Sequence, residues 1–106
     1  LDRAYDRYMK DAKKYLQSFD LNDAELAFRK ITAVHPNDGE PLFYLACIAS
    51  LREEKEEGFS LLKQAVEKGL KGRERILSAD QLAYLRIQPE FESLQQNLLP
   101  PGIIDK

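Results

Sequence analysis

The feature that most constrains this chain is an internal repeat, because two stretches of the sequence match at an offset of 34 residues. Small residues align with small ones, and large apolar residues mostly align with large ones. The aligned pairs are Ala12 with Ala46, Tyr15 with Ala49, Ala24 with Gly58, Phe28 with Leu62, Ile31 with Ala65, and Pro36 with Leu70. Such short units bury their apolar faces against each other, so the sequence predicts a fold in which the two copies stack.

Each copy is expected to be a pair of helices, because apolar residues recur at steps of three and four and no sustained alternation indicates a strand. A first helix is expected over about 2–17 and a second over about 22–34. Asn22 and Glu25 have the spacing of a capping box at the start of the second helix. Pro36 ends that helix, because the residue before a proline disfavours helical geometry.

The second copy has the same organisation. A helix over 42–51, with Pro41 in its first turn, is apolar nearly all round, which predicts a central helix covered on several sides. The acidic run 52–57 forms the next turn and favours the start of a fourth helix by its charge. Gly69 and Gly72 end the fourth helix.

The last third of the chain has shorter helical patterns. Residues 80–85 can form one to two helical turns, and Pro89 opens a last helix. The tail 98–106 is apolar but interrupted by prolines. We therefore expect this tail to be extended or disordered.

Composition argues against several classes of function. The net charge is only −2 and no segment carries a basic stripe, so the electrostatic footprint of a nucleic-acid-binding protein is missing. No run approaches the roughly 18 apolar residues of a membrane span. The single cysteine, Cys47, excludes an internal disulfide and suits a reducing compartment such as the cytoplasm. The chain begins at Leu1 rather than Met, which fits a piece of a longer protein.

The repeat resembles the tetratricopeptide repeat (TPR), a 34-residue helix-turn-helix unit. The family pattern is large-x2-Leu-small-x2-Tyr, then Ala-x3-Phe, then Pro. The first copy carries Tyr8, Ala12, Tyr15, Ala24, Phe28 and Pro36, and the second carries Leu42, Leu45, Ala46, Ala49, Gly58 and Leu62. Asp11 departs from the pattern where the family prefers Leu, and Phe19 and Glu53 stand where the turn usually has Gly. Leu70 replaces the final Pro of the second copy.

The stretch 78–97 is similar to the shortened terminal hairpin of some bacterial tetratricopeptide proteins. The residues that carry this similarity are Leu82, Leu85 and Arg86, followed by Pro89, Phe91 and Leu94. The resemblance implies an all-α fold of antiparallel helix hairpins stacked as a short right-handed α-solenoid. It has two full repeats, over about 5–38 and 39–72, and a degenerate third hairpin. One domain over 1–97 would then be followed by the tail 98–106.

No constellation of catalytic or metal-binding residues is present, so we expect no enzyme, no cofactor and no metal. His35 has no placed nucleophile and fits a helix end. Cys47 lies in an apolar helix and fits packing or groove lining better than nucleophilic attack. The glutamates of 53–57 lack the spacing of a calcium loop. An aromatic stripe at helical spacing indicates core rather than a ligand box, and its members are Tyr5, Tyr8, Tyr15 and Phe28.

The resembled family binds proteins or peptides in a concave groove lined by the first helix of each hairpin, which implies a protein-interaction module here. The residues that would face this groove are Met9, Lys13, Leu16, Phe43, Tyr44, Cys47 and Ser50. Lys13 would pair with a carboxylate of an extended or helical peptide. Packing of the same residues on a neighbouring repeat of a longer protein is the equal alternative.

Two further expectations concern the partner. Chaperone-binding members carry a clamp of Lys, Asn and Arg, and this chain has Met9, Lys13, Tyr44 and Glu40 at the matching places, so chaperone tails are disfavoured. The rival to a binding module is a structural role, as a terminal or oligomerisation domain of a larger protein with no ligand of its own. In that role the apolar tail would dock on a neighbouring copy.

Overall fold

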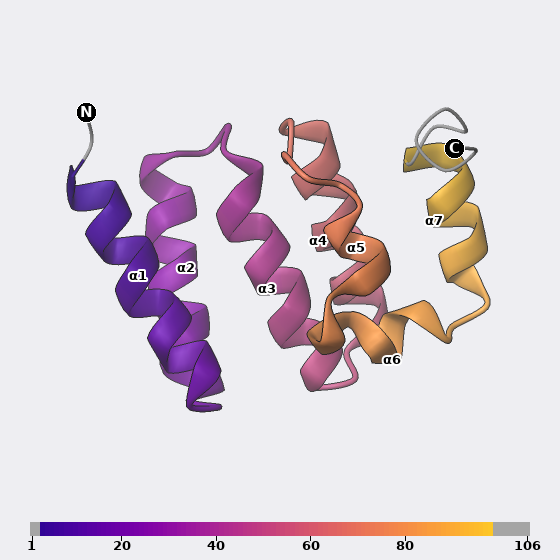
Figure 1. Cartoon of the computed structure of the whole chain (residues 1–106), viewed down its shortest axis with the longest axis horizontal. Coiled ribbons are helices and arrows are strands. Elements are labelled where there is room, and N and C mark those ends of the chain that lie inside the picture. Colours follow the sequence, from indigo (N-terminus) through magenta and orange to yellow (C-terminus); the bar gives the residue numbers. More distant parts are fainter. Residues whose placement is uncertain (1–2, 99–106) are drawn as a thin grey trace.

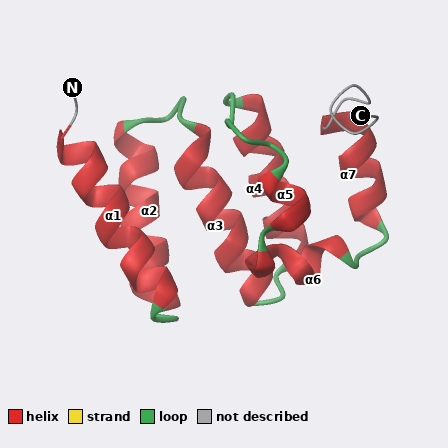
Figure 2. Cartoon of the chain, in the orientation of Figure 1, coloured by secondary structure: helices red, strands yellow, loops and turns green. Residues whose placement is uncertain are grey.

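The computed structural model describes residues 3–98 of the chain, and this part is all-helical as predicted, with no strand (Figure 2). The first hairpin consists of α1 Arg3–Gln17 and α2 Leu21–Val34, and the second of α3 Gly39–Leu51 and α4 Lys55–Glu67. The last described elements are α5 Arg75–Ser78, the 3₁₀ turn η1 Asp80–Leu82, α6 Ala83–Arg86 and α7 Glu90–Leu98. We call them the terminal hairpin for short, although the main packing partner of α7 is α4. The hairpins follow one another along the long axis, with α1 and α7 at opposite ends (Figure 1).

Helix α3 is central, as its apolar sequence predicts. It packs against α2 and α4, and both η1 and α6 also contact it. Ten of its 13 residues are buried, so all of its faces are covered. The small and large residues aligned between the two copies meet at these helix contacts. Those that are completely inaccessible to solvent are Ala12, Ala24, Phe28, Ala46, Leu62 and Ala65.

The 34-residue period is visible in the backbone of the two interhelical turns. Phe19 and Glu53 both have a φ of 59°, in the left-handed region. The first turn contains amide-to-carbonyl bonds from Ser18 to Lys14, Phe19 to Leu16, Asp20 to Tyr15 and Ala24 to Asp20. The second turn contains the equivalent bonds from Arg52 to Ile48, Glu53 to Ser50, Glu54 to Ala49 and Gly58 to Glu54. The two turns therefore share one backbone conformation despite different side chains.

Replacing Phe19 or Glu53 with glycine is expected to stabilise the chain by roughly 0.5–1 kcal/mol. A residue with a Cβ is strained at this φ, and the freedom of glycine in the unfolded chain cancels part of the gain. Phe19 is 70% exposed, so its loss removes little packing. Urea denaturation followed by circular dichroism measures the change. Ser18, in the same turn, does not have a positive φ, so Ser18→Gly should instead lower the stability. A change of the same sign in all three variants would contradict backbone strain at Phe19 and Glu53.

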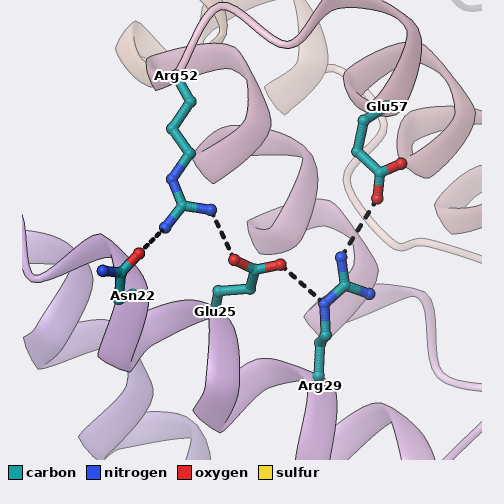
Figure 3. Close-up of polar contacts among 5 residues, drawn as sticks. All are labelled: Asn22, Glu25, Arg29, Arg52 and Glu57. Carbon is teal, nitrogen blue, oxygen red and sulfur yellow. Dashed lines mark hydrogen bonds and ion pairs between the residues drawn. The ribbon is translucent and has the colours of Figure 1, made fainter.

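A polar network joins the two hairpins across α2, the α3–α4 turn and α4 (Figure 3). Arg52, just after α3, donates to Asn22 and to Glu25 Oε1, the latter at 2.6 Å. Arg29 donates to Glu25 Oε2 at 2.9 Å and to Glu57 at 3.2 Å. The Glu25 carboxylate thus sits between two guanidinium groups, and their hydrogen bonds lower its pKa, with that of Arg52 the larger cause.

This network shows that the predicted capping box is wrong. Helix α2 begins at Leu21 with Asp20 as its N-cap, and the Asp20 side chain makes no capping hydrogen bond. Asn22 and Glu25 lie inside the helix and direct their side chains to Arg52. A charge-assisted bond to a guanidinium is stronger than a neutral one, so the tertiary contact overrides the local motif.

Replacing Glu25 with glutamine is expected to cost about 1 kcal/mol of stability at neutral pH. The pKa of Glu25 is lower in the folded chain than in the unfolded chain. Its contribution is therefore complete above the unfolded value of about 4.3 and is lost as the pH falls through the folded value. Denaturation curves of wild type and variant should converge in acid. If the difference in the free energy of unfolding between wild type and variant did not depend on pH, an ionised Glu25 in the network would be contradicted.

The terminal hairpin packs on the second hairpin, and its first helix, α5, lies outside the predicted helices. Three side chains of the terminal hairpin are completely buried, one each from α5, η1 and α6: Ile76, Leu82 and Leu85. Arg86 donates to the carbonyls of Ile76 and Ala79, at 3.1 and 2.6 Å, and so fixes the chain between α5 and α6. Helix α7 packs on α4.

The predicted tail lies outside the described residues, except for Leu98, which ends α7. Within residues 3–98, no helix combines the length and the apolar character that a membrane span requires.

Candidate partner-binding surface

Most residues predicted to line the groove are inside the protein rather than at its surface. Five are at most 5% exposed, namely Met9, Leu16, Phe43, Cys47 and Ser50. Only Lys13 and Tyr44 are partly exposed. Side chains with so little accessible surface cannot contact a partner while the domain stays folded. The surface available on this side of the domain is therefore smaller and more polar than the sequence alone indicates.

The terminal hairpin explains why α3 is covered. The Arg75 guanidinium lies 4.7 Å from the centre of the Phe43 ring. The same group forms two hydrogen bonds to the Glu40 carboxylate, at 2.9 and 2.8 Å, which raise the pKa of Arg75 above its usual value. Arg75 thus closes over the start of α3 and neutralises Glu40.

Cys47 packs in the core. Burial raises the pKa of its thiol to about 12, although the charges of Arg75 and Arg86 lower it slightly. A thiol with this pKa is protonated at neutral pH and is a poor nucleophile.

Tyr44 and Lys13 form the exposed centre of the surface. The Tyr44 ring stacks on Phe28 with 5.2 Å between centroids and 10° between planes, and the Phe43 ring meets its edge. Lys13 Nζ lies 5.3 Å from the centre of the Tyr44 ring. The core therefore holds Tyr44 rigidly, and the ring in turn positions the Lys13 ammonium by a cation–π contact.

A hollow of about 410 Å³ lies beside this pair on α1, and Lys10, Lys13, Lys14 and Glu40 are among the residues that line it. Within residues 3–98, none of the three lysines forms an ion pair. Two carboxylates also line the hollow: Glu40, which is already paired with Arg75, and Asp6, which offsets one of the three lysine charges. The hollow therefore has an excess of positive charge, which attracts carboxylates. We call Lys10, Lys13, Lys14 and Tyr44 the lysine surface.

The sequence-based site contained Lys13 and Tyr44 but omitted Lys10 and Lys14. The signal was present, because residues three and four apart share a face of a helix. Lys10, Lys13 and Lys14 have this spacing. The pairing of Arg75 with Glu40 had no comparable signal, since it joins residues 35 positions apart.

The aromatic stripe predicted to be core is only partly buried. Phe28 is completely buried, but Tyr8 and Tyr15 are 56% and 41% exposed, so the prediction is wrong for these two. The second hairpin packs on α2 rather than on this side of α1. Tyr5 is partly buried, and its hydroxyl donates to the Asp38 carboxylate. Burial, followed by that hydrogen bond, raises the pKa of Tyr5.

Comparison with known proteins adds no relative, because no family model, no curated protein and no solved structure gives a significant match to this chain.

Proposed function

We propose that this chain is a tetratricopeptide-type protein-interaction domain that binds an acidic peptide segment of a partner protein on the lysine surface. The observation that carries the proposal is the group of three lysines without a described carboxylate partner, next to a hollow and an aromatic ring held by the core. An extended segment with two or three carboxylates would satisfy the ammonium groups, and its apolar part would contact Tyr44.

Two features support the assignment of this role. The 34-residue period of the turns, with left-handed residues at equivalent positions, agrees with a helical repeat, and such repeats present extended binding surfaces. An unpaired positive patch also attracts an acidic partner over a distance and so accelerates its encounter.

Reversing two of the lysine charges is expected to weaken binding of an acidic peptide about tenfold. Display selection of random peptides on the full chain should enrich sequences rich in Asp and Glu, and one enriched peptide then serves for titration against the Lys10→Glu, Lys14→Glu variant. Binding should also weaken with added salt.

The matched control reverses Lys30 and Lys63, which are exposed like Lys10 and Lys14 but do not line the hollow of the lysine surface. Its affinity for the selected peptide should stay within about twofold of wild type. Selection of peptides without acidic residues, or an equal loss in both double variants, would contradict the proposal.

A structural role remains the second candidate, favoured by the exposure of Tyr8 and Tyr15. It predicts self-association of the full chain through apolar surface. Analytical ultracentrifugation over a wide concentration range separates the two functions, because a binding module stays monomeric without its ligand. The docking of the tail in this role falls on residues 99–106, outside the described part of the chain.

A further inference from the structure

The outer side of the first hairpin exposes large apolar side chains. Tyr8 and Tyr15 of α1 are 56% and 41% exposed, and Leu26 and Val34 of α2 are 57% and 73% exposed. All four border a hollow of about 610 Å³ between the two helices. Large exposed apolar patches mark sites of interaction with proteins, ligands or membranes. We call these four residues the end face.

The repeat identifies what covers the equivalent surface of the second hairpin. There Leu45, Ala49, Glu57 and Leu61 line a hollow of about 770 Å³. The residues 34 positions earlier, which line the hollow of the first hairpin, are Asp11, Tyr15, Asp23 and Ala27. The second hollow has a further wall, formed by residues 25 and 29 of α2, and Tyr84 of α6 also borders it. The first hollow is lined only by residues of the first hairpin, so no equivalent wall exists within the described chain.

The missing wall accounts for the different exposure of equivalent residues in the two hairpins. Leu42 and Ala49 are only 4% and 2% exposed, whereas Tyr8 and Tyr15, their counterparts in the first hairpin, are about half exposed. The end face also extends farther along the second helix of its hairpin. Leu26 and Val34 are apolar where the second hairpin has the exposed polar residues 60 and 68. The end face therefore offers a broader apolar footprint than α2 covers on the second hairpin.

The charged residues beside the hollow indicate which charge a helix that covers the end face should carry. Across the covered interface, Arg29 of α2 donates to Glu57 at 3.2 Å. The counterpart of Glu57 on the first hairpin is Asp23, which is exposed and forms no ion pair with a described residue. Asp11 adds a second carboxylate beside the same hollow, and Lys30 adds one ammonium group, so carboxylates outnumber lysines two to one in its lining. A helix that occupies this place needs an arginine or lysine where α2 has Arg29.

We propose that the end face is a docking site for an amphipathic α-helix of a partner protein that presents an apolar stripe and a basic residue opposite Asp23. A second copy of this chain fits less well. Its terminal helix α7 has no basic residue to offer Asp23. Glu90 of α7 is already paired with Lys55 at 2.9 Å, and Glu92 would bring a like charge to Asp11 and Asp23. The basic residue of its α2, Arg29, is already engaged by Glu25 and Glu57.

The test uses a synthetic peptide with the sequence of residues 20–34, because α2 is the helix that covers the equivalent face in this protein. A lactam bridge keeps the peptide helical, since an isolated helix of this length is marginal in water. The peptide is titrated into the isotopically labelled full chain. We expect saturable shifts of the amide signals of Tyr8, Tyr15, Leu26 and Val34.

Two variants sharpen the result. Leu26→Lys should weaken peptide binding about tenfold, whereas Ile87→Lys, the same kind of change at a 78% exposed residue of the terminal hairpin, should leave it unchanged. Arg29→Asp in the peptide should weaken binding to wild type, and Asp23→Lys in the full chain should restore it.

Three outcomes would overturn the proposal: no shifts at millimolar peptide, shifts confined to the lysine surface, or failure of the charge exchange to restore binding. Dilution-dependent shifts of the end-face signals without peptide, together with a dimer in sedimentation, would replace the partner helix with a second copy. An absence of shifts, or a failed charge exchange, leaves the acidic peptide proposed for the lysine surface untouched, because the four residues of the end face are not part of that surface.

Discussion

Replacing Gly39 with alanine is expected to lower the free energy of unfolding by about 3 kcal/mol or more. Gly39 begins α3, and a Cβ at this position would lie 2.4 Å from the carbonyl oxygen of Ala65 and 3.0 Å from the amide nitrogen of Leu70. Both contacts are with backbone at the end of α4, so no side-chain rotation can relieve the overlap. The start of α3 and the end of α4 would have to separate. Urea denaturation followed by far-UV circular dichroism measures the loss.

The sign of this effect separates steric overlap from helix propensity. Alanine is the better helix former by about 1 kcal/mol, so propensity alone predicts a gain. Gly69→Ala is the matched control, because Gly69 has a φ of +81° and no described atom within 4 Å of a Cβ placed there. Gly69→Ala should lower the free energy of unfolding only by the strain of a left-handed alanine, about 1–2 kcal/mol. If Gly39→Ala loses no more stability than Gly69→Ala, the close approach of α3 and α4 is contradicted.

The helices themselves could be predicted because their signals are local. Apolar spacing identified the residues that α3 buries, and Pro36 and Gly69 marked the ends of α2 and α4. The offset of 34 residues predicted two equivalent helix pairs, but the left-handed backbone of Phe19 and Glu53 was not predicted, and both residues stood out only as departures from the Gly of the resembled family.

The binding surface could be predicted only in part, because exposure depends on contacts between distant segments. Phe43 of α3 is only 3% exposed, and Arg75, 32 residues later, lies over its ring. Periodicity does not reveal where a short terminal hairpin will pack. The same limit applies to Tyr8 and Tyr15, whose spacing indicates burial without identifying the element that would bury them. A pattern defines which face is apolar, and only the tertiary structure shows whether another segment covers it.

Leu85 and Gly58 are expected to be strongly coupled in stability, because the terminal hairpin meets the second hairpin at this contact. Leu85 of α6 is completely buried, and a Cβ on Gly58 of α4 would lie 2.8 Å from its Cδ1. Leu85→Ala removes this packing and should cost about 3 kcal/mol. Gly58→Ala gains about 1 kcal/mol of helix propensity but must displace Leu85, so the two effects oppose each other in the wild type.

The double variant distinguishes the contact from general loosening of the terminal hairpin. Once Leu85 is alanine, the new methyl group at Gly58 has space and fills part of the cavity, so the double variant should exceed Leu85→Ala in stability by about 1–2 kcal/mol. Leu82→Ala is the matched control, since Leu82 is equally buried, but the three atoms nearest to the Gly58 Cβ position all belong to Leu85. Gly58→Ala should therefore be additive with Leu82→Ala, to within about 0.5 kcal/mol. Equal coupling to both leucines, or coupling to neither, would mean that α6 does not meet α4 at Gly58, and the terminal hairpin could not cap the second hairpin in the way this contact requires.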